Sequence, residues 1–120
     1  MRTRSATWAA VFYAALTLVL TYPFSTRLAT HVLSLGTDMD LAVWTIGWNV
    51  HAFTHRPWAI FDANIFFPCH NTLAYSENLI GSALIAAPVI WLTGNTVLGM
   101  NVVVLFSIAA SAFGAFLLAR

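Results

Sequence analysis

The sequence predicts an all-α, polytopic membrane protein with about three transmembrane helices and further interfacial helices in a large external loop. Hydrophobic residues make up 60% of the 120 residues, charged residues only 8%, and the mean hydropathy is +0.80. A soluble domain carries about 25% charged residues, so this chain has too few to cover a surface that faces water on every side. The ionisable residues also gather in a central segment, between uncharged runs of 22 and 42 residues.

The same composition excludes other classes of protein. The apolar content is too high for a disordered chain, which cannot bury this much hydrophobic surface. The formal net charge of +1 comes without a basic stripe, so nucleic acid is not an expected partner. The single cysteine, Cys69, cannot form a disulfide within the chain.

Residues 1–26 predict an N-terminal membrane anchor. Residues 5–26 carry no charge and are long enough to cross a bilayer core about 30 Å thick, which needs about 20 helical residues. Trp8 and Tyr22 stand near the two ends of this run, as expected of aromatic residues at membrane interfaces. A cleaved signal peptide is the alternative, but the run is long for one and no Ala-x-Ala site follows it.

Two arginines before the anchor predict the orientation of the chain. Arg2 and Arg4 favour a cytoplasmic N-terminus, because positively charged residues are enriched on that side of a membrane. We therefore expect a multi-pass protein of the cell membrane whose loop at residues 27–77 faces outward. Three crossings would also place Arg120 outside, against the same tendency.

Residues 78–120 predict two further transmembrane helices. Turn-forming residues at 93–96 divide the uncharged run into 78–92 and 96–119. The first helix is short and contains Pro88, so we expect a crossing helped by local thinning of the bilayer, with a re-entrant segment as the alternative. The last helix holds two pairs of small residues four positions apart: Ala110 with Gly114, and Ser111 with Ala115. Such pairs favour close approach of another helix and a larger bundle.

The external loop, residues 27–77, contains a predicted amphipathic helix. Apolar and aromatic residues recur at steps of three and four and would share one helix face: Leu41, Trp44, Trp48, His51 and His55. Because charges are sparse, we expect this helix to lie along the membrane interface and to end before Pro57. His51 and His55 have the spacing of two metal ligands, but no third ligand is evident, so packing at the interface explains them better.

Two carboxylates stand at the start of this helix, in Gly36-Thr37-Asp38-Met39-Asp40. One interpretation is a helix N-terminus capped by Thr37, with Asp40 favoured by the helix dipole. The other is a carboxylate pair that binds a cation or accepts a proton. Residues two apart share one side of extended backbone but lie about 200° apart in a helix. Joint action therefore requires Asp38 to lie outside the first helical turn.

Another acidic residue, Glu77, stands at the start of the next predicted helix. There Ser76 is the expected N-cap, and the carboxylate of Glu77 complements the positive end of the helix dipole. At the outward mouth of the bundle, Glu77 is also positioned to meet a substrate. Asn95 and Asn101 lie near the other predicted membrane surface, where an amide costs little, and we assign them no role.

Several short motifs together resemble the N-terminal region of the GT-C superfamily of polytopic glycosyltransferases. They are Gly36-x-Asp38-x-Asp40, Trp44 with Trp48, Phe66-Phe67-Pro68, Ser76-Glu77-Asn78, Pro88 and Asn101. The resemblance covers nearly the whole chain and is closest to bacterial members that align with mannosyl- and arabinosyl-type transferases. It implies an enzyme of the bacterial inner membrane that transfers a sugar from a polyprenyl-phosphate donor.

The resemblance also implies roles for individual residues. Asp38 would be the general base or the carboxylate that orients the acceptor, and Asp40 its partner or a ligand of Mg²⁺ or Mn²⁺. A carboxylate can take the proton of an acceptor hydroxyl, oxygen ligands suit these cations, and a departing phosphate needs positive charge nearby. Arg56 would contact that phosphate, and Glu77 the donor or the acceptor.

Members of this superfamily have many more membrane helices than three. The resemblance therefore implies that the remaining helices of a larger bundle complete the site, and we do not expect 120 residues alone to be catalytic. The alternative is a small non-catalytic membrane subunit, or a truncated remnant of such an enzyme, whose loop packs on another membrane subunit.

Overall fold

The computed structural model describes residues 2–33 and 36–119, and every regular element among them is helical. The four α-helices are α1 (Arg2–Leu20), α2 (Thr37–His55), α3 (Ile80–Thr93) and α4 (Thr96–Leu118). Three short 3-10 turns lie at Phe24–Thr26, Pro57–Ala59 and Thr72–Tyr75. The predicted all-α class is confirmed.

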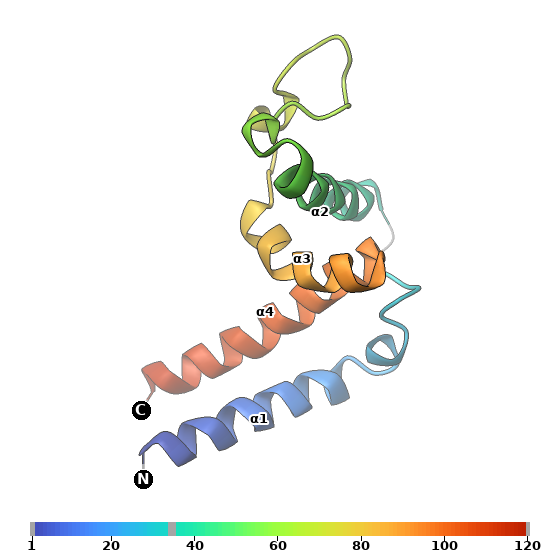
Figure 1. Cartoon of the computed structure of the whole chain (residues 1–120). Helices are drawn as coiled ribbons and strands as arrows, with labels where there is room; N and C mark the ends of the chain where they lie inside the picture. Colours follow the sequence, from blue (N-terminus) through green and yellow to red (C-terminus); the bar gives the residue numbers. More distant parts are fainter. Residues whose placement is uncertain (1, 34–35, 120) are drawn as a thin grey trace.

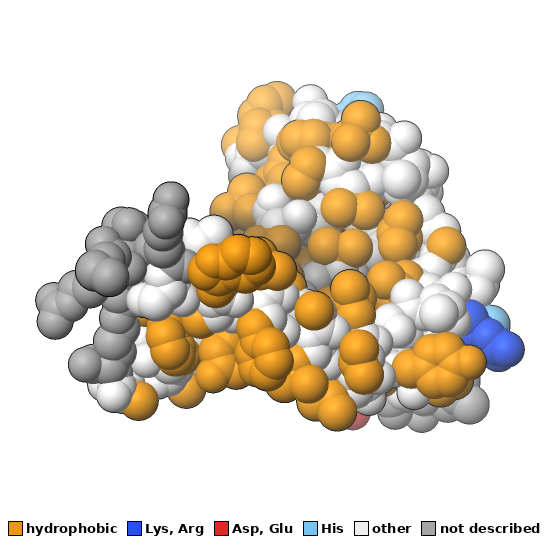
Figure 2. All heavy atoms as spheres, turned by 90° about the horizontal axis from the view of Figure 1, so that it is seen from below, with side chains coloured by type: hydrophobic (Ala, Val, Ile, Leu, Met, Phe, Trp, Pro, Cys, Tyr) orange, Lys and Arg blue, Asp and Glu red, His pale blue; other side chains and the backbone are white. Residues whose placement is uncertain are grey.

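Helices α1 and α4 form an antiparallel pair, here called the hairpin. They lie side by side and run in opposite directions, so the two ends of the chain lie together (Figure 1). The rings of Tyr13 and Phe116 meet across the pair, with centroids 6.3 Å apart. The face of the molecule seen in Figure 2 is dominated by hydrophobic side chains. Of the described helices, α4 alone is long and apolar enough for a membrane crossing, since residues 5–20 and α3 are apolar but shorter.

The second part of the molecule, here called the head, consists of α2, α3, the loop between them and the first turns of α4. It lies at the end of the hairpin away from the chain termini (Figure 1). Its core is a cluster of small and branched side chains: Ile46, Val50, Ala83, Ala86, Ala87 and Val103. Two glycines allow the helices to approach closely. A Cβ at Gly47 would lie 3.1 Å from Thr96 Cγ2, and one at Gly99 would lie 2.5 Å from Ile90 Cγ1.

The structure confirms some predicted helix ends and corrects others. Helix α2 ends at His55, before Pro57, and the turn at 93–96 is present, with Gly94 left-handed and Asn95 Oδ1 accepting from Leu98 N. The predicted caps are wrong. Thr37 is already helical, and the N-cap of α2 is Gly36; α3 begins only at Ile80, so Ser76 lies too far upstream to cap it.

The small residues of α4 are placed differently from the prediction. Nothing in the described chain lies within 4 Å of a Cβ at Gly114, and Ala110, Ser111 and Ala115 are exposed. Close helix packing occurs at Gly99 instead, against Ala86 and Ile90 of α3. The reason is that α1 contacts a different face of α4 from the one that carries the small pairs.

Candidate functional site

Asp38 and Asp40 do not form a pair. Both lie in the first turn of α2, where residues two apart point about 200° away from each other. Asp38 accordingly lines one cavity and Asp40 a different groove. The condition for their joint action, an Asp38 outside the first helical turn, is not met.

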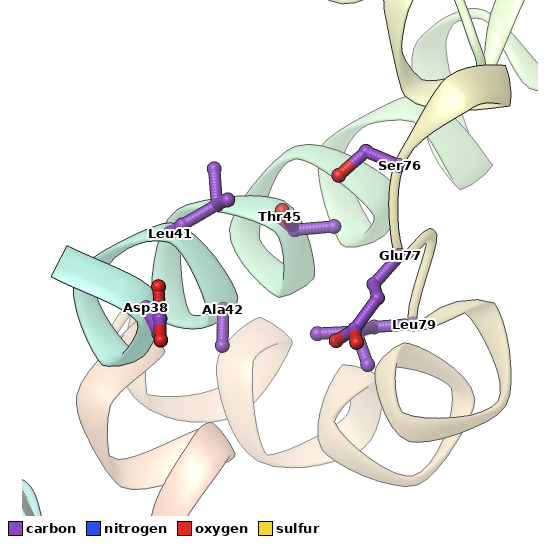
Figure 3. A pocket seen from close by; sticks show the side chains of 7 residues that line it. All are labelled: Asp38, Leu41, Ala42, Thr45, Ser76, Glu77 and Leu79. Carbon is purple, nitrogen blue, oxygen red and sulfur yellow. The ribbon is translucent and has the colours of Figure 1, made fainter.

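Asp38 instead shares a cavity with Glu77, here called the acidic cavity. It has a volume of about 360 Å³ and is lined by Asp38, Leu41, Ala42, Thr45, Ser76, Glu77 and Leu79. Figure 3 shows the two carboxylates entering from opposite walls, Asp38 from α2 and Glu77 from the segment that leads into α3. Leu41, Ala42 and Leu79 contribute apolar side chains to the lining, and Thr45 and Ser76 contribute hydroxyl groups. Two predicted site residues, distant in sequence, are therefore brought to one site.

A polar face of α2 builds the wall beneath this cavity. Asp38, Ala42, Thr45 and Asn49 follow one another at steps of four, three and four residues, so they share one side of the helix. Thr45 and Asn49 are almost fully buried. Asn49 Nδ2 donates to the backbone oxygen of Asn78, which fixes the segment that carries Glu77 against α2.

Three buried polar atoms near this contact have no partner among the described residues. They are Asn49 Oδ1 and the Oδ1 and Nδ2 atoms of Asn78. An unsatisfied buried polar group costs about 1–3 kcal/mol, so these amides are available to a polar group from outside the described chain. Asn49 was not identified from the sequence, although the spacing of small and polar residues on its face of α2 was a usable signal. Asn78 was identified only within the Ser76-Glu77-Asn78 motif, with no role assigned to it.

Another face of α2 carries the predicted aromatic stripe and lines a groove of about 670 Å³. Trp44 and Trp48 are nearly parallel, at 14°, with centroids 6.3 Å apart, and His51 stacks on His55 at 4.1 Å. Trp48 Nε1 donates to Ile60 O over 2.8 Å, which orients its ring. Within residues 2–33 and 36–119, no group of three or more His, Cys, Asp or Glu could hold a metal ion.

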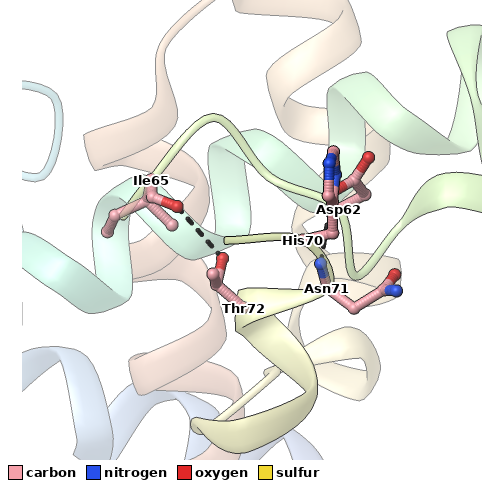
Figure 4. Close-up of polar contacts among 5 residues, drawn as sticks. All are labelled: Asp62, Ile65, His70, Asn71 and Thr72. Atoms are coloured by element: carbon pink, nitrogen blue, oxygen red, sulfur yellow. Dashed lines mark hydrogen bonds and ion pairs between the residues drawn. The ribbon is translucent and has the colours of Figure 1, made fainter. Parts of the chain in front are cut away.

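Arg56 belongs to a third cavity, of about 260 Å³, together with Asp62 and His70. Asp62 Oδ1 accepts from the backbone N–H of Asn71 over 3.1 Å and lies 3.1 Å from His70 Nδ1 (Figure 4). The pKa of Asp62 is lowered most by the hydrogen bond from the Asn71 N–H. His70 and the positive charge of Arg56 lower it further. Arg56 therefore lies with Asp62, apart from the acidic cavity.

Of the three cavities described above, the acidic cavity is the candidate functional site. No protein-family model, curated protein or solved structure matches the chain. Two carboxylates line this cavity beside apolar side chains, and carboxylates are groups that can take a proton from a hydroxyl or bind a cation that prefers oxygen ligands. Neither of the other cavities brings together two carboxylates.

Proposed function

We propose that the chain is the membrane-embedded N-terminal part of a GT-C-type glycosyltransferase, and that the acidic cavity receives a hydroxyl acceptor and a polyprenyl-phosphate sugar. The observation that carries the proposal is the meeting of Asp38 and Glu77 in one cavity of the head, beside an apolar hairpin. A lipid-linked donor needs such an arrangement, because its lipid stays in the bilayer while its sugar must reach polar groups. The remaining helices of a longer protein complete the site.

The carboxylates supply the acid–base chemistry of this proposal. Asp38 takes the proton of the acceptor hydroxyl while the new bond forms between the acceptor oxygen and the anomeric carbon of the sugar. The bond from that carbon to the phosphate oxygen breaks, and the polyprenyl phosphate leaves with the electron pair. Glu77, on the opposite wall, accepts a hydrogen bond from a second hydroxyl and orients the sugar.

In this proposal the cavity also holds a divalent cation, because its oxygen atoms are of the kind that Mg²⁺ and Mn²⁺ prefer. Asp38, Glu77, Ser76 and Thr45 contribute carboxylate and hydroxyl oxygens to its lining, and Mg²⁺ is commonly held by one or two carboxylates together with water and phosphate. A bound Mg²⁺ or Mn²⁺ would neutralise charge on the departing phosphate. Asp40 and Arg56 lie in other cavities, so Asp38 and Glu77 replace them in this proposal as the cation and substrate residues.

The proposal is tested in proteoliposomes that hold the longest form of the protein that expresses, supplied with a radiolabelled polyprenyl-phosphate sugar. Asp38→Asn should lower the transfer rate by a factor of at least about 100, the usual contribution of a positioned general base. Asp62→Asn, the same chemical change in the third cavity, should stay within about twofold. An Asp38→Asn protein that transfers sugar at the normal rate removes this residue from the mechanism.

The same assay separates the acidic cavity from the predicted aspartate pair. Glu77→Gln should lower transfer together with Asp38→Asn, because both side chains line one cavity. Asp40→Asn should have a much smaller effect. Large and equal losses in Asp38→Asn and Asp40→Asn, with Glu77→Gln fully active, would instead support the pair.

A non-catalytic membrane subunit is the second candidate function. The exposed apolar side chains of α3 favour it, among them Leu84, Trp91 and Leu92, which expose 60%, 58% and 87% of their surface. A subunit of this kind would cover part of α3 with another membrane protein. Purification with a stoichiometric membrane partner, in which Asp38→Asn and Glu77→Gln leave the activity of the complex unchanged, would favour this function over the transferase.

A further inference from the structure

We infer that α1 and α4 alone cross the bilayer and that α3, the part of the head next to the hairpin, enters it from one side without crossing. Both ends of the hairpin helices that lie near the chain termini are then on the opposite side of the membrane from α2 and the loop between α2 and α3. This inference rests on the membrane location assumed in the proposed function. It replaces the three crossings predicted from the sequence with two, and it identifies the occupant of the apolar hairpin surface as lipid.

The directions of the helices do not agree with three crossings. With three consecutive crossings, the first and third membrane helices run in the same direction, and the chain ends lie on opposite sides. In the structure α1 and α4 run in opposite directions and their outer ends lie together (Figure 1). The segment that follows α1 in sequence lies against the start of α4. Asn95 Nδ2 donates to Ala29 O over 2.9 Å, and Asn101 Nδ2 donates to Leu28 O over 2.7 Å.

Helix α3 is too short, and too far toward one end of the hairpin, to cross the membrane. Its 14 residues span about 21 Å at 1.5 Å per residue, whereas the 19 residues of α1 span about 29 Å, close to the hydrocarbon core of about 30 Å. It packs beside the first turns of α4, where Gly99 meets Ile90 and Ala86, rather than along the whole hairpin. Its exposed side chains, such as Leu84 and Leu92, are apolar. A helix of this length, placed at one end of a hairpin, reaches into one leaflet only.

The surface of the hairpin exposes large apolar side chains. Beyond the head, α4 packs against α1, and the remaining surfaces of both helices expose large apolar side chains. On α1 these are Trp8, Val11, Phe12, Leu18, Val19 and Leu20, and on α4 they are Phe106, Ile108, Leu117 and Leu118. No charged residue occurs within 5–26 or 78–119. A surface that is largely apolar and carries no charge over this length fits lipid.

The charges near the ends of the chain agree with two crossings. In the sequence, Arg2 and Arg4 precede the apolar part of α1, and Arg120 follows α4. Three crossings separate Arg120 from the two N-terminal arginines, whereas two crossings place all three on one side. Arginines next to membrane helices favour the cytoplasmic side, so the two-crossing arrangement removes the conflict that three crossings create.

Cysteine labelling decides between the two arrangements, because the chain contains one cysteine. Cys69 is exposed in the head and serves as the first reporter. Ala119→Cys and Thr93→Cys, each made in a Cys69→Ser background, report on the end of α4 and on the turn before it. A membrane-impermeant maleimide is applied to sealed spheroplasts, and the same samples are labelled again after detergent is added to give the total.

Two crossings place Cys69 and the thiol of Thr93→Cys on one side, and that of Ala119→Cys on the other. We expect at least a tenfold difference between the labelled fractions of Cys69 and Ala119→Cys in sealed spheroplasts, and the reverse difference in inverted vesicles. Three crossings predict equal labelling of Cys69 and Ala119→Cys, with Thr93→Cys protected. Equal labelling overturns the inference even if Thr93→Cys does not fold, because the comparison of residues 69 and 119 is sufficient.

The outcome also distinguishes this inference from the proposed function. If Cys69 and Ala119→Cys label from the same side, the two-crossing arrangement fails while the transfer assay with Asp38→Asn stands. If Asp38→Asn keeps full activity, the transferase proposal fails while the labelling pattern stands. If sodium carbonate at high pH releases the protein from membranes, the lipid-facing hairpin is refuted, and both proposals lose their common premise.

Discussion

The hairpin and the head are held together by different kinds of interaction. In the hairpin, rings and aliphatic side chains meet across α1 and α4, and the hydroxyls of Thr17 and Ser107 bond to carbonyls of their own helices. In the head, amide and indole side chains donate to the backbone of distant segments. Four such donors are Trp48, Asn49, Asn95 and Asn101.

The difference arises because the backbone hydrogen-bonding groups of the two regions find their partners in different ways. A helix satisfies most of its own N–H and C=O groups, so two helices can pack through apolar contacts that tolerate exchange of one side chain for another. The connections around α2 and α3 are irregular, and their carbonyls need donors from side chains. The head is therefore specified by individual residues. Substitutions should affect the two regions unequally.

The largest difference should come from Asn101, the buried amide that anchors the connection after α1. Asn101→Leu leaves the carbonyls of Leu28 and His31 without their donor, which should cost roughly 3 kcal/mol because each unsatisfied buried group costs about 1–3 kcal/mol. Denaturant unfolding in detergent micelles measures the loss. Asn64→Leu, the same change at an exposed asparagine, should cost less than about 0.5 kcal/mol. Equal losses would show that the amide at 101 is not an anchor.

A matched pair of glycines in one helix compares the packing of the two regions directly. A Cβ at Gly99 would press on Ile90 of the head, whereas a Cβ at Gly114 of the hairpin meets nothing in the described chain. Gly99→Ala should destabilise the protein by about 1–2 kcal/mol through overpacking. Gly114→Ala should stabilise it by up to about 1 kcal/mol, since alanine favours a helix interior. If both substitutions shift the thermal unfolding temperature in the same direction, the expected difference in packing between the head and the hairpin is contradicted.

Asn78 tests whether the orphaned amides serve function rather than stability. Both polar atoms of its side chain are buried without a partner in the described chain, so Asn78→Leu removes a desolvation cost and should leave the protein equally stable or stabilise it by up to about 1 kcal/mol. Asn49→Leu should destabilise it, because the Asn78 carbonyl loses its donor. If Asn78 contacts substrate or a further helix, Asn78→Leu should also lower sugar transfer. A destabilising effect as large as that of Asn49→Leu would contradict this account.

The sequence predicted the parts of the fold that depend on local patterns. The aromatic spacing and Pro57 defined the course and end of α2, and the turn residues at 93–96 separated α3 from α4. Which helices cross, and in which direction, was not predictable in this way, because side chains in an apolar run carry little information about their neighbours. The antiparallel arrangement depends on Asn95 and Asn101 reaching back to residues 28–31.

The candidate site was predicted in its residues but not in its pairing. Asp38 and Glu77 were both identified from sequence, yet Asp38 was matched with Asp40 because the two are neighbours. Their separation arises because both lie in the first turn of α2, where residues two apart point in different directions. Asp38 instead shares a cavity with Glu77, and the hydrogen bond from Asn49 to Asn78 joins the two segments that form this cavity, which no local pattern connects.

The smallest effect is expected at Asp62, in the exposed loop of the head. The Asn71 N–H, more than His70, lowers the pKa of this carboxyl from its ordinary value of 3.8. The stabilisation of the loop is therefore present above pH 3.8 and is lost as the pH falls through the lowered pKa. The backbone amide of Asn71, followed by nuclear magnetic resonance in micelles, should titrate with a midpoint below 3.8. Asp62→Asn should abolish this titration, whereas His70→Ala should retain most of the lowering, and a midpoint above 3.8 in the unmodified chain would refute the hydrogen bond.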